Sequence, residues 1–193
     1  MKITLAKILD QIIVIDIEST CWEGKIPEEQ ESEIIEIGIC PLDIKTGDVT
    51  GRTCIFIKPE RSEVSEFCTK LTGITKERVE KGTSFEEACL DLQENYLTKK
   101  RTWASWGDYD RNMFQKQCKS FGVKYPFGHS HINVKNLFAV ILKLKHEVGM
   151  DKALEILNLP LEGSHHRGKY DAWNIANILS HLIHNCQMKD VTL

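Results

Sequence analysis

The 193-residue sequence has no apolar stretch long enough to cross a bilayer, and Met1–Asp10 has no hydrophobic run of the kind found in a signal peptide. Its seven cysteines are an odd number and are scattered, without the paired spacing of a disulfide framework. Internal repeats and low-complexity linkers are also lacking. We therefore expect a soluble, cytoplasmic protein with reduced thiols and no membrane partner.

The sequence also lacks an excess of basic residues. Its 25 lysines and arginines are outnumbered by 28 acidic residues, so the formal net charge of −3 provides no overall field to attract nucleic acid. An enzyme acting on nucleic acid would have to gain phosphate affinity locally, from metal ions and a few basic side chains. The hydrophobic fraction of 41% and the chain length are typical of one folded domain, which we expect over residues 1–193 with its core at about 10–185.

Apolar patterns predict an α/β domain. A β-branched run at Gln11–Ile17 and apolar segments at Ile34–Ile44 and Cys54–Ile57 predict three strands with short connections, hence an antiparallel meander. A fourth strand is predicted at Arg101–Trp106, among helical segments. The predicted helices are Glu63–Leu71, Thr75–Glu80, a longer one capped at Thr83–Ser84, Asp110–Phe121, Asn133–Val148, Asp151–Leu157 and Tyr170–Asn185.

The first candidate functional feature is the acidic pair Asp16 and Glu18. They lie two residues apart at the end of the first predicted strand, so both side chains point to the same face. Adjacent carboxylates repel each other unless a cation lies between them. Ligands that are all oxygen suit Mg²⁺ or Mn²⁺. The alternative interpretation is a solvated strand end.

The second feature is Trp106–Asp110, where a strand leads into a helix. A carboxylate here, from Asp108 or Asp110, can meet the first pair at one edge of the sheet. The alternative is a residue that only caps the helix.

The third feature is His166–Asp171, at the start of the last helix. A loop histidine followed by a carboxylate in the first helical turn can place a base beside a metal ligand. Histidine suits general-base chemistry near neutral pH, and we expect Gly168 to act as a hinge that leaves His166 free to move. The alternative is a solvent-exposed His-His-Arg loop.

Together and in this order, these features resemble the DEDDh exonuclease superfamily, and most closely its histone-mRNA-type and RNA-interference-associated 3′ exonucleases. The resemblance spans nearly the whole chain and rests on Asp16–Cys21, Glu33–Gly38, Phe67–Thr75, Trp106–Asp110 and His166–Asp171. The Leu-Thr-Gly-Ile-Thr run is the most telling part, because nothing in generic folding requires it. The resemblance implies a single-domain ribonuclease H-like exonuclease fold, with a central mixed sheet (an antiparallel meander plus parallel strands) flanked by helices.

The resemblance also implies roles for particular residues. Asp16, Glu18, Asp110 and Asp171 would bind two divalent ions, Mg²⁺ or Mn²⁺, and His166 would be the general base. Asp110 matches better than Asp108 because the family's aspartate begins the helix and precedes an apolar residue by three or four positions. His166 matches better than His165 because the family's histidine lies five residues before the last aspartate.

Substrate contacts follow from the same resemblance. Leu71 would wedge against the terminal base and Thr72 would hydrogen-bond to the terminal nucleotide, while Trp22 is a candidate for stacking on a base or for packing in local core. The full set of expected substrate-binding residues is Thr20, Trp22, Leu71, Thr72, Gly73 and Ile74.

The expected function is a 3′–5′ exonuclease that releases nucleoside 5′-monophosphates from the 3′ end of RNA or single-stranded DNA, with RNA favoured, by a two-metal mechanism. Three alternatives stay open: a noncatalytic nucleic-acid-binding module, a phosphohydrolase of very short oligonucleotides, and a polymerase-associated proofreading subunit. The presence of the histidine and all four carboxylates favours the enzyme over the noncatalytic module.

Overall fold

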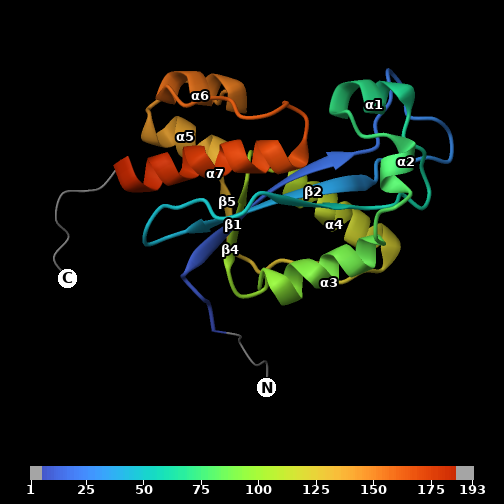
Figure 1. The fold of residues 1–193 in the computed structure, drawn as a ribbon, viewed down its shortest axis with the longest axis horizontal. Helices are drawn as coiled ribbons and strands as arrows, with labels where there is room; N and C mark the ends of the chain where they lie inside the picture. The colour runs from blue at the N-terminus through green and yellow to red at the C-terminus, as the bar shows by residue number, and fades with distance from the viewer. Residues whose placement is uncertain (1–5, 186–193) are drawn as a thin grey trace.

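A computed structural model describes residues 6–185 of the protein. Within this range the chain forms a central sheet with helices on both faces (Figure 1). The elements are β1 (Gln11–Ser19), β2 (Ile34–Asp43), β3 (Thr53–Phe56), α1 (Glu66–Thr72), α2 (Lys76–Val79), α3 (Phe85–Asn95), β4 (Thr102–Ser105), α4 (Tyr109–Phe121), β5 (His131–Asn133), α5 (Val134–Ile141), α6 (Met150–Leu157) and α7 (Gly168–Asn185). None of these helices combines the length and apolar character needed to cross a membrane.

The strands are arranged in the order β3-β2-β1-β4-β5. β1, β2 and β3 pair antiparallel, whereas β4 pairs parallel to β1 and β5 parallel to β4. The predicted mixed sheet is therefore confirmed. β5 was not delimited from sequence, because a three-residue strand shows no period of its own and forms through its pairing with β4.

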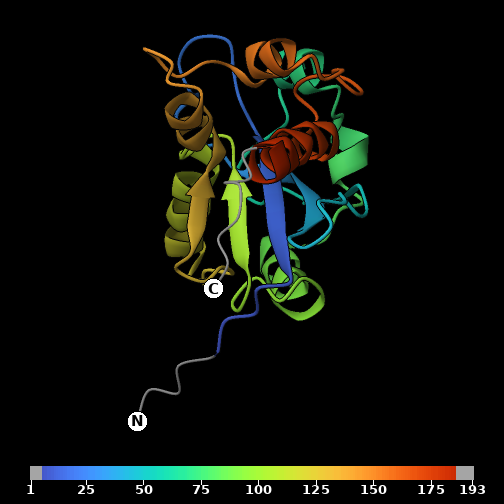
Figure 2. The same ribbon diagram turned by 90° about the vertical axis from the view of Figure 1, so that its left-hand side faces the viewer.

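Helices cover both faces of the sheet (Figure 2). A hydrophobic core lies between the helices and the sheet on each face. Side chains alternate along a strand, so Ile12 and Val14 of β1 pack with α5, α6 and α7, whereas Ile13 and Ile15 pack with α3 and α4. Asp16 and Glu18 continue the series of Ile12 and Val14. The alternation therefore places both carboxylates on the α7 face, just beyond its apolar core.

One predicted helix is too long. The segment Asn133–Val148 forms α5 only as far as Ile141, and Lys143 takes a left-handed conformation with φ of 54°. The N–H group of Leu144 then bonds to the carbonyl of Ala139 at 2.9 Å. Because Leu142 and Leu144 turn back to pack on the α7-side core, the apolar pattern continues after the helix has ended.

Candidate active site

Three carboxylates converge where β1 ends and α7 begins. Asp16 and Glu18 are half-buried on β1, and Asp171 is buried in the first turn of α7. One carboxylate oxygen from each lies within 4.8 Å of the others. A single cation can therefore contact oxygens from all three residues.

Asp110 comes from the first turn of α4 and is 4% exposed. Its Oδ1 accepts a hydrogen bond from the backbone N–H of Ile17 at 3.0 Å. Because Ile17 lies between Asp16 and Glu18 on β1, this bond holds the Asp110 carboxylate against the part of the strand that carries both acids. Asp108 occupies the N-cap position but makes no side-chain cap hydrogen bond, and it pairs instead with Arg111 at 3.1 Å. Asp110 thus faces the other carboxylates, whereas Asp108 takes part in a surface ion pair.

A cleft of about 270 Å³ opens beside these acids. Sequence reasoning gave no role in a site to several residues of its wall, among them Trp106, Tyr109 and Lys135. Tyr109 adjoins Asp110 in sequence, and its hydroxyl lies 2.9 Å from that of Ser19. Lys135 carries no local signal, because only the packing of α5 brings it to this cleft.

The electrostatics of the cleft disfavour four ionised carboxylates. Burial raises the pKa of Glu18 to about 8, and the nearby charge of Asp171 adds to that shift. Burial raises the pKa of Asp110 to about 7. Burial also raises the pKa of Asp16, with a further contribution from repulsion by Asp110 and Asp171. Such a cluster is stabilised by bound cations, and its all-oxygen ligands suit Mg²⁺ or Mn²⁺.

Both candidate histidines lie next to Asp171. The backbone N–H of His166 donates to Asp171 Oδ2 at 2.9 Å, and Nδ1 of His165 lies 3.1 Å from the same oxygen. The two imidazole rings stack with centroids 4.1 Å apart, and His165 is the one that lines the cleft. Burial and the neighbouring His165 hold the pKa of His166 below its ordinary value, which favours the neutral ring that a general base requires.

The start of α7 is locked to the sheet, which contradicts the predicted hinge at Gly168. A Cβ atom on Gly38 would lie 1.9 Å from the carbonyl oxygen of Gly168, so β2 and α7 touch backbone to backbone. The buried carboxylate of Glu36 accepts from the N–H of Gly168 at 3.0 Å and from Nε of Arg167 at 3.2 Å. Gly168 therefore permits close packing, not movement. Glu36 was quoted in the sequence motif without a role, and its contacts identify it as the anchor of this segment.

The predicted substrate segment divides into exposed and buried residues. Leu71 is 40% exposed on α1, and Gly73 follows it in a left-handed conformation with φ of 70°. Thr72 is buried instead, with its hydroxyl donating to the Cys68 carbonyl at 2.8 Å, and Ile74 is 1% exposed. The side chains of Thr72 and Ile74 thus hold the segment together and do not face a substrate.

A similar correction applies to the loop after β1. Thr20 is completely buried, and its hydroxyl accepts from the N–H of Glu33 at 2.9 Å and donates to the Glu31 carbonyl at 3.3 Å. The side chain of Thr20 therefore fixes the loop, and its hydroxyl is not free to bond to a substrate. Trp22, two residues later, is half-buried.

Comparisons with known proteins agree with this geometry. A family model described as Exonuclease, RNase T, matches residues 13–179. The human (Homo sapiens) 3′–5′ exoribonuclease 1 is 29% identical over 191 residues, which cover 93% of this chain and 54% of the relative, so the chain spans about half the length of that protein.

Two solved structures are also similar. The nuclease domain of 3′hExo, a DEDDh family member bound to rAMP, matches with a TM-score of 0.83 and 28% identity over 94% of this chain and 96% of that one. A 3′-exonuclease that recognises the 3′ end of a histone mRNA stem-loop matches with a TM-score of 0.83 and 27% identity over 94% and 66% of the two chains. On the family match, which extends from β1 to α7, the chain belongs to the RNase T exonuclease family.

Proposed function

We propose that this protein is a metal-dependent 3′–5′ exonuclease that removes nucleoside 5′-monophosphates from the 3′ end of single-stranded RNA. The observation that carries the proposal is the convergence of Asp16, Glu18 and Asp171, with one oxygen of each within 4.8 Å of the others. A buried fourth carboxylate from Asp110 and a histidine-bearing loop adjoin them. The scattered free cysteines support a cytoplasmic location as part of the proposal.

The four carboxylates are the residues that would hold two Mg²⁺ or Mn²⁺ ions. When bound, such ions stabilise the attacking and leaving oxygens of a phosphodiester and supply a nucleophile at neutral pH. The chain itself provides the base: we assign the neutral ring of His166 to take the proton from the attacking water. His165 is then the positioning partner, because its Nδ1 is already directed at Asp171.

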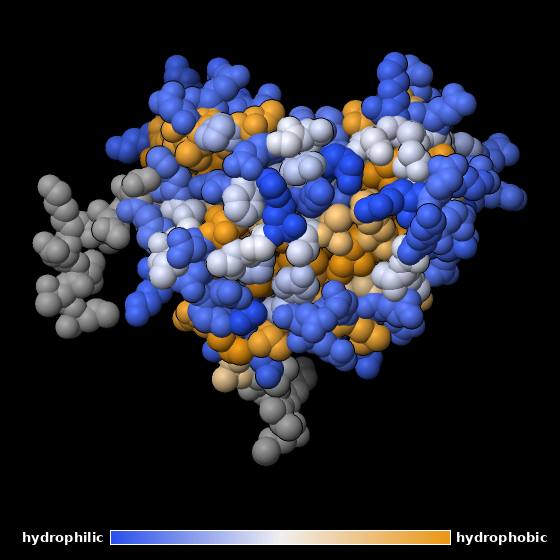
Figure 3. All heavy atoms as spheres, in the orientation of Figure 1, coloured by the Kyte–Doolittle hydropathy of each residue, from blue (hydrophilic) through white to orange (hydrophobic). Residues whose placement is uncertain are grey.

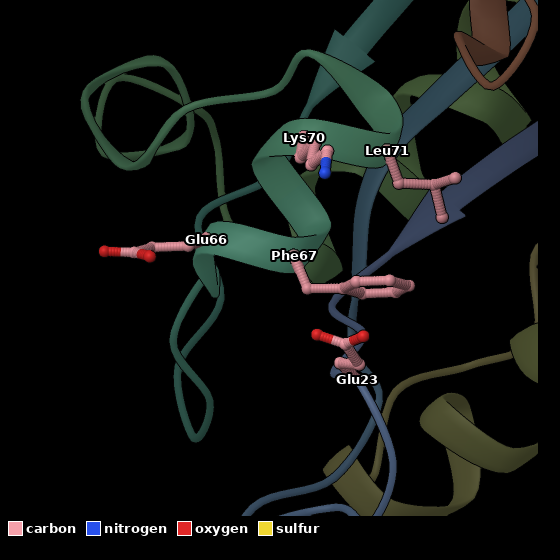
Figure 4. A pocket seen from close by; sticks show the side chains of 5 residues that line it. All are labelled: Glu23, Glu66, Phe67, Lys70 and Leu71. Carbon is pink, nitrogen blue, oxygen red and sulfur yellow. The ribbon is translucent and has the colours of Figure 1, made fainter.

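A pocket of about 420 Å³ beside α1 suits the terminal nucleotide (Figure 4). Phe67 and Leu71 project from one side of the helix, one turn apart, and Glu23 of the loop after β1 faces the Phe67 ring. An aromatic ring and an adjacent aliphatic side chain can enclose a base, while Lys70 is near enough to offer charge to a phosphate. The face of the molecule around α7 mixes hydrophilic residues with apolar patches (Figure 3).

The deciding experiment is degradation of 5′-labelled RNA and DNA oligomers with Mg²⁺, with Mn²⁺ and with EDTA. The expected result is a ladder of shortened products that needs metal, forms faster on RNA, and disappears in Asp16→Ala. Measurable binding without shortening under any metal condition would establish the noncatalytic module instead. Cleavage that slows steeply as the oligomer lengthens would establish the phosphohydrolase of very short oligonucleotides.

The histidine assignment is tested by comparing His166→Ala with His165→Ala. General-base catalysis typically contributes a factor of about 10² to 10⁴, so His166→Ala should lose rate on that scale, and His165→Ala should lose less. A larger loss of rate in His165→Ala than in His166→Ala would identify His165 as the base. The proposal of a metal-dependent exonuclease would not be affected by that result.

A further inference from the structure

A second cavity lies at the far end of α4 and differs in charge from the acidic cleft. It has a volume of about 540 Å³, within the range that accommodates a nucleotide. Lys99, Lys119 and His129 line it, and no carboxylate occurs among the wall residues that belong to the described part of the chain. Aromatic and polar side chains complete the wall, among them Tyr125, Phe127 and Gln115. We call this feature the basic cavity.

The walls of the basic cavity are held in place by hydrogen bonds between its two loops. The N–H of Gly128 donates to the carbonyl of Thr98 at 2.9 Å, and the hydroxyl of Thr98 donates to that of Pro126 at 2.7 Å. Nζ of Lys99 lies 3.4 Å from the Phe127 carbonyl, and the Phe127 ring stacks on Trp103 with centroids 4.1 Å apart. A cavity built in this way is preformed, so a ligand need not order its walls.

α4 connects the basic cavity to the candidate active site. Arg111, Gln115 and Lys119 recur every fourth residue and so share one face of the helix. From Asp110 to Lys119 the helix rises about 14 Å, at about 1.5 Å per residue. A nucleic-acid strand of roughly four nucleotides covers that length at about 3.4 Å per stacked nucleotide.

Charge along this face increases away from the cleft. Arg111 is paired with Asp108 at 3.1 Å and lies 3.5 Å from the ring of His131 on β5, so its charge is partly balanced. Lys99 and Lys119 are exposed and line the cavity without an acidic neighbour in its wall. The two exposed lysines therefore lie where the strand would leave the enzyme.

We propose that the basic cavity is a second binding site for the substrate strand, which holds a nucleotide and its phosphate about four or more nucleotides before the 3′ end. The inference rests on the proposed function. It explains how a chain with a net charge of −3 can retain a polyanion whose reacting end lies among four carboxylates. Lys99 and Lys119 contact phosphate, while Tyr125 offers an aromatic surface to a base.

Binding is measured by fluorescence anisotropy with a 20-nucleotide RNA and with a trinucleotide, in the presence of Mg²⁺. The protein carries Asp16→Ala so that cleavage does not intervene. The test variant adds Lys99→Gln and Lys119→Gln, and glutamine keeps a donor for the Phe127 carbonyl. A matched control replaces two exposed lysines on other turns, Lys45→Gln and Lys81→Gln, which removes the same charge.

We expect the test variant to bind the 20-mer about tenfold more weakly and the trinucleotide equally well. Its salt dependence (the slope of log K against log salt) should flatten by about 1.4, because two phosphate contacts on a single strand are lost. The control should change neither quantity. In the active enzyme the same double substitution should raise KM for the 20-mer and leave kcat unchanged. Lys119→Gln alone, which alters only an exposed helix position, should show a smaller effect in the same direction.

Equal affinities of test and control variants for the 20-mer would overturn the proposal, and so would an equal loss for the trinucleotide. If the two variants bound RNA alike but the test variant alone lost binding to poly-glutamate, the cavity would serve an acidic protein, and the proposal would again be wrong. Failure of the wild type to shorten RNA refutes the proposed function separately, because the anisotropy measurement does not depend on cleavage.

Discussion

Two groups of buried acids in this protein have different surroundings. Glu33 and Glu36 are 1% and 0% exposed, and each carboxylate is fully engaged with donors. Glu33 accepts from the N–H groups of Glu60 and Arg61, both at 2.8 Å. Asp110 and Asp171 are equally buried at 4% and also accept hydrogen bonds, but they line the same cleft as Asp16. The difference separates acids that hold parts of the fold together from acids whose clustered charges a cation would stabilise.

The two groups are also connected. Glu36 accepts from Gly168, at the start of the helix that carries Asp171. An acid outside the cleft therefore positions the helix that carries one of the acids inside it. Substitutions at Glu36 should therefore affect mainly the stability of the fold, whereas substitutions among the acids of the cleft should affect mainly activity.

The largest expected effect comes from Asp16→Asn. If the cluster binds catalytic ions, exonuclease activity should fall by on the order of 10³-fold, because several kcal/mol of transition-state stabilisation are lost. In EDTA, however, the variant should unfold at a higher temperature than the wild type, since one of several repelling charges is gone. Addition of Mg²⁺ should raise the Tm of the wild type and have much less effect on the variant. An unchanged Mg²⁺ response would mean that Asp16 does not help to bind the ion.

The next largest effect is expected from Glu36→Ala. Removal of this carboxylate leaves Gly168 and Arg167 without their acceptor and should cost about 3 kcal/mol in the free energy of unfolding, measured with urea. The milder Glu36→Gln should cost less but still lower kcat, because Asp171 shifts with α7. Glu33→Gln is the matched control, since it is equally buried but anchors the Glu60–Arg61 turn. Equal losses of kcat in the two glutamine variants would show that Glu36 acts only through stability.

Gly38→Ala should have an intermediate effect of about 2 kcal/mol, as overpacking of a tight contact typically does. The new methyl group would meet the Gly168 carbonyl, which lies 1.9 Å from the ideal Cβ position, so α7 must move away from β2. Because Glu36 holds the same contact, Gly38→Ala and Glu36→Gln together should cost less than the sum of their separate effects. If the losses in the free energy of unfolding, measured with urea, were strictly additive, the two residues would act through independent contacts.

The smallest effect concerns the capping box of α3, where Ser84 and Glu87 bond to each other's backbone. Ser84→Ala should destabilise the protein by about 1 kcal/mol and leave kcat/KM unchanged. Hydrogen bonds from Thr83 and Ser84 lower the pKa of Glu87 from 4.5 to about 2. Because the folded-state pKa is depressed, this contribution is present above pH 4.5 and is lost as pH falls towards 2. The urea stability of Ser84→Ala should thus depend less on pH in that window, and an unchanged dependence would contradict the role of the cap.

Sequence reasoning succeeded where the signal was local. The capping residues Thr83 and Ser84 correctly predicted the start of α3, and the β-branched run from Ile12 to Ile15 correctly predicted β1. It failed where a residue's role depends on distant neighbours. Gly168 was predicted to be a hinge because a glycine in a loop often is one, but Gly38, 130 positions earlier in the chain, meets it backbone to backbone and makes it a packing contact.

Thr72 and Thr20 show the same limit. Both belong to motifs that suggested contact with a substrate, and both hydroxyls are bonded within the protein. A motif identifies residues that a family needs, but it does not separate those that touch a ligand from those that hold the motif's shape.

By itself, the sequence determined that Asp16 and Glu18 share a face, because side chains on a strand alternate with a period of two. It also determined the helical turns that carry Asp110 and Asp171, since their local patterns suffice. Only the tertiary structure decided that these turns meet the end of β1, that Glu36 anchors one of them, and that Lys135 joins the cleft. Those relations arise when sheet order and helix packing bring distant segments together, and no local pattern encodes a distance between them.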